Sequence, residues 1–136
     1  MMARLFATLA VLTYAAAVPV MELNDTHVFN PGWLSHARLH EVWQLSTNSA
    51  IGLVALWQVW VRNDLRWQCC LTLLVTTGFF LAYALQDSYG GSMMHTDGSE
   101  KTIMGVNIGL VGFGIASSLS MLAWVLGPPA RTSSRR

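Results

Sequence analysis

Residues 67–86 read WQCCLTLLVTTGFFLAYALQ and contain no Asp, Glu, Lys or Arg. The length of this run matches the ~20 residues that an α-helix needs to cross the ~30 Å hydrocarbon layer of a bilayer. Lipid offers no partner for backbone N–H and C=O groups, so a spanning segment is either a helix or a strand of a closed barrel. The run is too long and too uniformly apolar for a barrel strand, whose residues alternate in polarity. We therefore predict a transmembrane helix.

Three further runs contain no Asp, Glu, Lys or Arg, at residues 5–20, 42–61 and 102–126. We predict helices over about residues 5–20, 34–61, 67–86 and 102–126. With 53% hydrophobic and only 11% charged residues, the chain of 136 residues departs from the composition of soluble domains. The predicted fold is all-α: a polytopic membrane protein whose four transmembrane helices form one bundle over residues 1–136. The lipid bilayer is its expected environment.

The first segment has a second interpretation. Arg4, the apolar run after it and the small residues 15–17 also resemble a secretory signal peptide with its cleavage site. Cleavage would leave three helices. The loop that follows would stay on the same side of the membrane in either case.

Basic residues divide unequally between the two sides of this layout. Arg38 and Lys101 fall on one side, and the other side holds Arg4, Arg62, Arg66, Arg131, Arg135 and Arg136. By the positive-inside rule we expect both termini to be cytoplasmic. The loops at residues 21–35 and 87–101 then face the lumen, the periplasm or the exterior. We expect no nucleic-acid partner.

Ionisable side chains concentrate in residues 23–41, LNDTHVFNPGWLSHARLHE. His36 and His40 are four residues apart, which places them on one face of the predicted second helix. Gln44, Thr47 and Asn48 continue that face into the membrane. A polar stripe of this kind should face the bundle interior or a wet cavity.

The second helix has two candidate starting points. Asn30 followed by Pro31 is a typical cap and first turn, and Ser35 would cap a shorter helix.

The stretch supports two kinds of chemistry. A histidine and a carboxylate in a low-dielectric setting can pass protons to and from a lipophilic small molecule, as in an isomerase or cyclase. Alternatively, histidines four residues apart can share a divalent metal with ligands from the loops. The candidate catalytic residues are His27, His36, His40, Glu41, Asp25 and Arg38. The candidate substrate-binding residues are Asn30, Trp33, Gln44 and Asn48, and the candidate metal ligands are His36, His40 and His27.

Two other interpretations stay open. The stretch is a purely structural cap if its histidines bond only to the backbone of their own turns. The protein is non-enzymatic if it is a transporter or an accessory subunit of a membrane complex. An accessory subunit predicts that the polar stripe meets a partner protein rather than a cavity.

Small residues mark the last predicted helix. Gly105 and Gly109 would form a face that lets another backbone approach, within the bundle or in an oligomer. Asn107 in the same helix should point inward, because an amide facing lipid is costly.

The runs NDTHVFNPGW and SHARLHEVW resemble a family of small four-helix membrane proteins whose signature is N-x-T-H, then F-N-P-x-W, then H-A-R-x-H. The resemblance covers about a sixth of the chain. It implies a four-helix fold but no particular reaction. The residues of the shared pattern are Asn24, Thr26, His27, Phe29, Asn30, Pro31, Trp33, His36, Ala37, Arg38 and His40.

Overall fold

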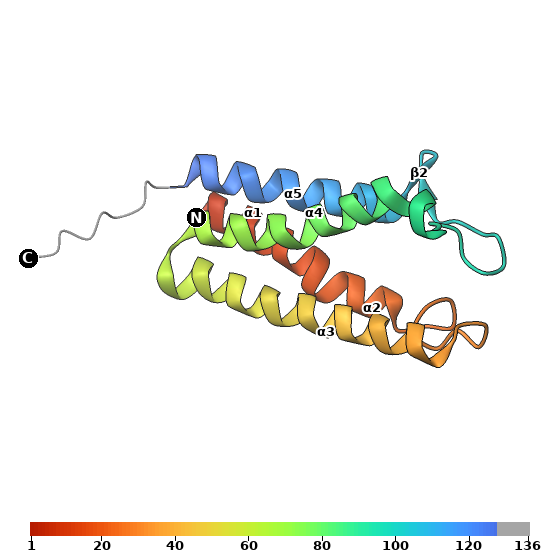
Figure 1. Cartoon of the computed structure of the whole chain (residues 1–136). Coiled ribbons are helices and arrows are strands. Elements are labelled where there is room, and N and C mark those ends of the chain that lie inside the picture. Colours follow the sequence, from red (N-terminus) through yellow and green to blue (C-terminus); the bar gives the residue numbers. More distant parts are fainter. Residues whose placement is uncertain (128–136) are drawn as a thin grey trace, which may run out of the picture.

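The computed structural model describes residues 1–127, which form four long helical segments lying side by side (Figure 1). The first segment consists of α1 (Met2–Leu12), a π-helical stretch (Thr13–Ala17) and α2 (Val18–Glu22). The second is α3 (Ser35–Trp57), which continues into a π-helical stretch (Gln58–Arg62). The third is α4 (Leu65–Tyr89) and the last is α5 (Ile108–Leu126). A two-stranded hairpin, β1 (Thr102–Ile103) and β2 (Val106–Asn107), precedes α5.

Three of these segments are long and apolar enough to cross a membrane: Met2–Glu22, Leu65–Tyr89 and Ile108–Leu126. They fit an integral, multi-pass membrane protein, as the sequence predicts. The segment α3 is of similar length but is not among the three. Its first turns carry both basic and acidic side chains, and its middle carries amides and hydroxyls.

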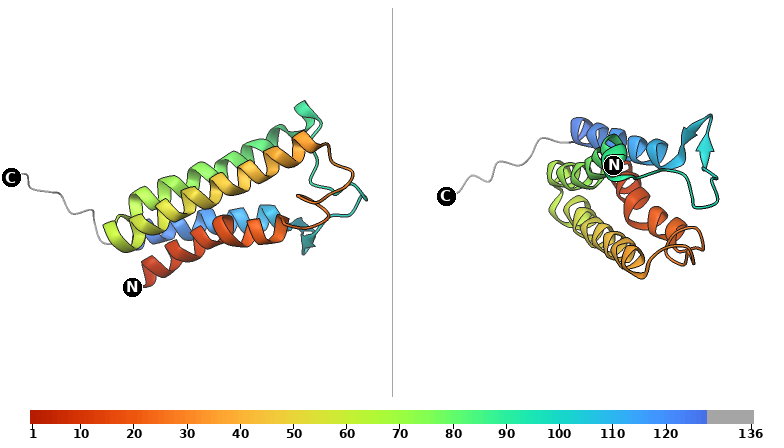
Figure 2. Two further views of the ribbon diagram at one scale, coloured as in Figure 1. Left: turned by 90° about the horizontal axis from the view of Figure 1, so that it is seen from below. Right: turned by 45° about the vertical axis from the view of Figure 1, so that its right-hand side comes forward.

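The two ends of the bundle differ. Both long loops, residues 23–34 and 90–107, lie at one end, which we call the loop end (Figures 1 and 2). The N-terminus and the turn at residues 63–64 lie at the other end, which we call the terminal end. Of the basic residues used to predict orientation, Arg131, Arg135 and Arg136 lie outside the described residues.

Pro19 explains the distortion of the first helix. It has no N–H, so the carbonyl of Ala15 loses its α-helical donor, and the chain widens into the π-helical stretch just before it. Ser49 of α3 replaces the missing donor, with its hydroxyl 3.0 Å from that carbonyl. Gly52, one turn further along α3, permits the approach, because a Cβ there would lie 2.2 Å from the Ala15 Cβ.

The predicted start of the last span at residue 102 is wrong. Residues 102–107 form the β1–β2 hairpin, in which Thr102 pairs with Asn107 and Ile103 with Val106. Its turn residues Met104 and Gly105 both have positive φ, 54° and 80°, the geometry of a tight hairpin turn rather than of a helix. The span begins at Ile108, and the hairpin is an exception to the all-α prediction.

The predicted small-residue face of Gly105 and Gly109 is wrong for the same reason, since Gly105 lies in the turn. Gly109 faces the bundle, where a Cβ would meet Phe79 at 3.1 Å. Asn107 is buried, as expected, but it caps α5 instead of lying within it: its Oδ1 accepts the Gly109 N–H at 2.7 Å. Gly105 and Gly109 therefore do not share one face of a helix.

Candidate functional site

The two loops of the loop end are joined to each other. Asn30 is almost fully buried, and its Nδ2 donates to the Thr26 carbonyl at 3.0 Å and to Thr96 Oγ1 at 3.3 Å. Its Oδ1 accepts the Gly32 N–H at 2.9 Å. Of the two candidate starts of the second helix, Asn30 is excluded, because both ends of its amide are used in the loop. The helix α3 begins at Ser35, with Leu34 at the cap position.

A close acid–base pair lies beneath this junction. Glu22 ends the first helix, and its Oε2 lies 2.8 Å from Nε2 of His27 in the following loop. The side chains of both residues are mostly buried, with 22% and 23% exposed. The sequence proposed Asp25 and Glu41 as the carboxylate partner and missed Glu22. The only signal was its position, five residues before His27 at the end of an apolar helix.

Local hydrogen bonds fix the tautomer of His27. The Asn24 amide nitrogen donates to the Met21 carbonyl, so its oxygen accepts, and Thr26 donates its hydroxyl proton to that oxygen at 2.6 Å. The Thr26 hydroxyl has no second proton, yet it lies 2.9 Å from His27 Nδ1. Nδ1 must therefore carry the proton of this contact, an assignment made from the hydrogen-bond network.

This tautomer leaves one proton to be shared by His27 and Glu22. With Nδ1 protonated, Nε2 presents a lone pair to Glu22 unless the ring is doubly protonated. At 2.8 Å the two groups are close enough that either the carboxyl or the imidazole can hold a proton that the other is able to accept. Burial, followed by the charges of His95 and Lys101, lowers the pKa of His27. This favours the arrangement in which Glu22 holds the proton and His27 is neutral.

Aromatic rings enclose His27 on two sides. His95 of the second loop lies edge-on at 5.0 Å between ring centroids, and Trp33 lies edge-on at 5.9 Å. Trp33, predicted to bind substrate, is thus beside the acid–base pair. Phe29 and Leu23 of the same loop are exposed apolar side chains. The pair therefore lies in apolar and aromatic surroundings at the rim of the bundle.

His36 and His40 form a separate pair. Their Nε2 atoms lie 3.0 Å apart, and His40 stacks on Trp43 with ring centroids at 5.7 Å. All three side chains are exposed. Among residues 1–127, no group of three His, Cys, Asp or Glu side chains is placed to hold a metal ion. The predicted ligand set of His27, His36 and His40 is therefore not assembled.

The polar stripe of α3 does not face the interior, contrary to the prediction. Gln44 and Thr47 are exposed and Asn48 is half-buried, whereas Leu45, Gly52 and Ala55 form the buried side of α3. The remaining candidate catalytic residues are dispersed: Asp25 is exposed, and Arg38 and Glu41 are half-buried. Within the described chain, none of these three makes an ion pair within 4.0 Å.

The polar residues of the bundle interior lie elsewhere, between α4 and α5. Gln68, fully buried, donates to Thr72 at 2.9 Å and to Ser120 at 3.0 Å. One turn further, Ser117 donates to Thr76 at 2.9 Å. This seam was not predicted from the sequence. The signal was the spacing of 68, 72 and 76, which puts three polar residues on one face of an apolar helix.

No family model, curated protein or solved structure matches the chain. The site must therefore be interpreted from its own geometry.

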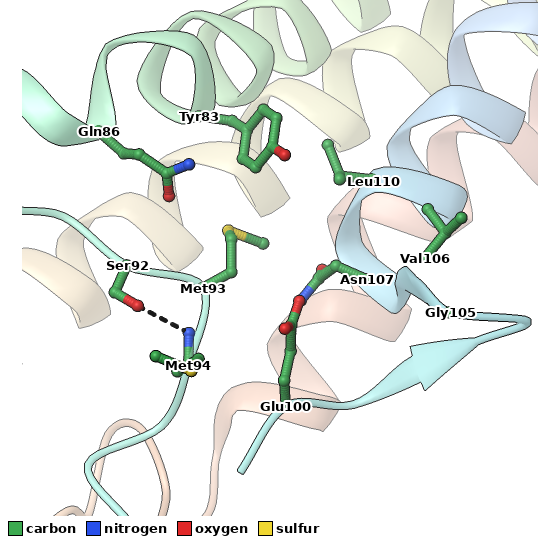
Figure 3. Close-up of a pocket in the computed structure, with 10 residues that line it drawn as sticks. All are labelled: Tyr83, Gln86, Ser92, Met93, Met94, Glu100, Gly105, Val106, Asn107 and Leu110. Carbon is green, nitrogen blue, oxygen red and sulfur yellow. Dashed lines mark hydrogen bonds between the residues drawn. The ribbon is translucent and has the colours of Figure 1, made fainter. Parts of the chain in front are cut away.

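A cavity of about 440 Å³ opens at the loop end, away from the histidines (Figure 3). It lies between the end of α4, the second loop, the hairpin and the start of α5. The side chains that line it are Tyr83, Gln86, Ser92, Met93, Met94, Glu100, Val106, Asn107 and Leu110, together with Gly105. None of them was a candidate site residue in the sequence. The sequence predicts a helix from residue 102, whereas the β1–β2 hairpin brings these residues together.

Proposed function

We propose that this protein is a membrane enzyme in which Glu22 and His27 transfer protons to and from a lipophilic small molecule, in an isomerisation or cyclisation. The observation that carries the proposal is the 2.8 Å distance between Glu22 Oε2 and His27 Nε2, which brings a carboxyl and an imidazole into direct contact. A pair of this kind can donate the proton from the carboxyl and accept one at the imidazole. The exposed Leu23 and Phe29 beside it offer an apolar surface to a substrate that arrives from the bilayer.

The proposal includes a fourth membrane span and an orientation. The segment α3 packs along the bundle, and in a membrane it would be the fourth crossing. The terminal end carries Arg4, Arg62 and Arg66, and the loop end carries Arg38 and Lys101 among six acidic residues. The positive-inside rule then puts the terminal end in the cytoplasm and the acid–base pair in the lumen, the periplasm or the exterior.

The test works without an identified substrate. Purified protein in lipid nanodiscs is incubated with a membrane lipid extract in D2O, and the extract is analysed by mass spectrometry. An enzyme that removes a proton from carbon and returns one introduces deuterium at that carbon. We expect protein-dependent deuterium in one lipid component, reduced at least ~100-fold by Glu22→Gln, the scale of a lost general acid or base.

The control is Asp87→Asn, which converts an exposed carboxylate of α4 at the same end of the bundle into an amide. It should leave the incorporation of deuterium unchanged. Equal incorporation by the native protein and Glu22→Gln, or no protein-dependent incorporation, would contradict the proposal.

A second function is favoured by a different observation, the exposure of Gln44 and Thr47 on α3. Amide and hydroxyl groups that face lipid are costly, so a partner helix is expected to cover them in an accessory subunit. A cysteine at Thr47 should then form cross-links to another membrane protein in native membranes. The same substitution at Leu74, an exposed apolar residue of α4, is the control. Equal cross-linking from both positions would exclude a specific partner on α3.

A further inference from the structure

The hairpin holds one carboxylate against the cavity at the loop end. Asn107 Oδ1 is occupied by the Gly109 N–H, so its Nδ2 is directed to Glu100 Oε1 at 3.0 Å. The Ile108 N–H donates to the Lys101 carbonyl at 2.9 Å, which ties the base of the hairpin to the start of α5. The hydrogen bond from Asn107 therefore holds one oxygen of the Glu100 carboxylate in place. Among the hydrogen bonds of residues 1–127, none engages its other oxygen, Oε2.

The rest of the cavity lining combines polar side chains with one aromatic ring and several apolar side chains. Figure 3 shows Tyr83 and Gln86 of α4 facing Glu100 and Asn107 across the cavity, with Met93 between them. Leu110 of α5 adds an aliphatic side chain. A single negative charge, an aromatic ring and thioether side chains are the combination that suits a cation with apolar substituents.

The end of the bundle around the cavity carries a net negative charge, as Glu100 does. Apart from Glu22, which holds a proton in the favoured arrangement, five acidic residues lie at the loop end, against Arg38 and Lys101, and Lys101 does not line the cavity. An excess of one charge around a concave site raises the local concentration of ions of the opposite charge. The cavity, at about 440 Å³, is within the ~300–1,000 Å³ of small-molecule sites.

We propose that this cavity binds a small organic ammonium ion, whose charged group lies against Glu100 and whose apolar substituents lie against Tyr83, Met93 and Leu110. Neither Glu22 nor His27 lines the cavity, so the site is independent of the proposed enzyme function.

Isothermal titration of the purified full chain in detergent tests the proposal, with benzyltrimethylammonium as the probe. Benzyl alcohol serves as the uncharged comparison, and titration into empty micelles corrects for partitioning. We expect saturable binding of one cation per chain and no saturable binding of the alcohol. Glu100→Gln should weaken binding by about tenfold, through loss of the attraction between two opposite charges near the protein surface. Tyr83→Leu should weaken it by about threefold or more through loss of the aromatic face.

Asp87→Asn is the matched control, because Asp87 is an exposed acid of α4 beside Gln86 that does not line the cavity. It should bind the cation as the native chain does, and so should Glu22→Gln. Equal weakening by Asp87→Asn and Glu100→Gln would mean general attraction to the acidic surface and would overturn the proposal. Binding of the cation unchanged by both Glu100→Gln and Tyr83→Leu would overturn it too.

Discussion

The Ser49 hydroxyl of α3 donates a hydrogen bond to the Ala15 carbonyl of the first helix, at 3.0 Å. This carbonyl is the group that loses its helical donor because residue 19 is proline. In a membrane no water replaces such a donor, so a side chain from a neighbouring helix must supply it. Pro19 and Ser49 therefore depend on each other, although 30 positions separate them.

We predict that Ser49→Ala lowers the free energy of unfolding by about 1–2 kcal/mol, since it leaves a buried carbonyl without its donor. The measurement is unfolding by sodium dodecyl sulfate in mixed micelles, followed by circular dichroism. Ser46→Ala, at an exposed position of the same helix, should have no measurable effect. In a Pro19→Ala background, Ser49→Ala should cost less free energy of unfolding, because the restored N–H of residue 19 can donate to the Ala15 carbonyl in place of Ser49. An undiminished loss in that background would contradict the mechanism.

Gly52→Ala should destabilise the bundle by about 1–3 kcal/mol, the usual cost of overpacking. The added methyl group would lie 2.2 Å from the Ala15 Cβ, and the two helices would have to separate. Gly78→Ala is the comparison, because nothing lies within 4 Å of a Cβ there. It should stabilise α4 by up to ~1 kcal/mol through helix propensity. Equal effects of the two substitutions in the same unfolding assay would refute the contact.

The contact between Gln68 and Ser120 should be measurable as a coupling energy. A double-mutant cycle of Gln68→Leu and Ser120→Ala is expected to give ~0.6 kcal/mol and at most ~1.7 kcal/mol, the range of hydrogen bonds between membrane helices. Ser118 is exposed and bonds only to the Gly114 carbonyl of its own helix. The cycle of Gln68→Leu with Ser118→Ala should therefore give no coupling. A coupling as large as that of Ser120 would show that the effect is not local.

Acidification should loosen the loop end through His27. Burial lowers the pKa of this imidazole below its ordinary 6.5, and the charges of His95 and Lys101 act in the same direction. Below pH 6.5 the His27 imidazole therefore binds fewer protons in the folded chain than in the unfolded chain, so its contribution to stability falls as the pH falls. The proton that Glu22 holds in the folded chain acts in the opposite direction, so the contribution of His27 is measured against a variant that keeps Glu22. The amide protection factors of residues 24–30, which correct for the pH dependence of intrinsic exchange, should fall more steeply in the native chain than in His27→Gln below about pH 6.5. His27→Gln, which keeps a polar group beside Glu22, should flatten this dependence.

His36→Gln is the control for that experiment, because the His36 ring is exposed and lies outside the Glu22 pair. It should leave the acid-dependent exchange of residues 24–30 in place. An identical response of the native chain and His27→Gln would assign the loosening to other groups.

Asn30→Ala should disconnect the two loops. The variant removes the donor to Thr96 and leaves the Thr26 carbonyl and the Gly32 N–H without their partner, at a cost of about 1–3 kcal/mol. Amide exchange of residues 94–98 is expected to increase, although this segment is more than sixty residues away in the chain. Asn48→Ala is the matched control, since no hydrogen bond of its side chain exists in the described part of the chain. Unchanged exchange at residues 94–98 would show that Asn30 does not tether the second loop.

The sequence determined the class of protein and the end of the bundle that holds ionisable groups. Hydropathy is a local property that sums along the chain, so the uncharged run at 67–86 was sufficient to predict a membrane helix, and α4 confirms it. The loops between such runs had to contain the charges, because lipid excludes them.

Only the tertiary structure decided which polar groups meet. Partner choice depends on how each helix is rotated and how the loops fold back, and neither is encoded in local composition. The rotation of α3 places Gln44 on the outside of the bundle. The buried hydrogen bonds of the interior are instead made by Gln68 and Ser120. The sequence predicts a helix at residues 102–107, but the turn at Met104 and Gly105 makes this segment a hairpin that lines a cavity. Glu22 became the partner of His27 because the Asn24 turn folds the loop back onto the helix that it leaves.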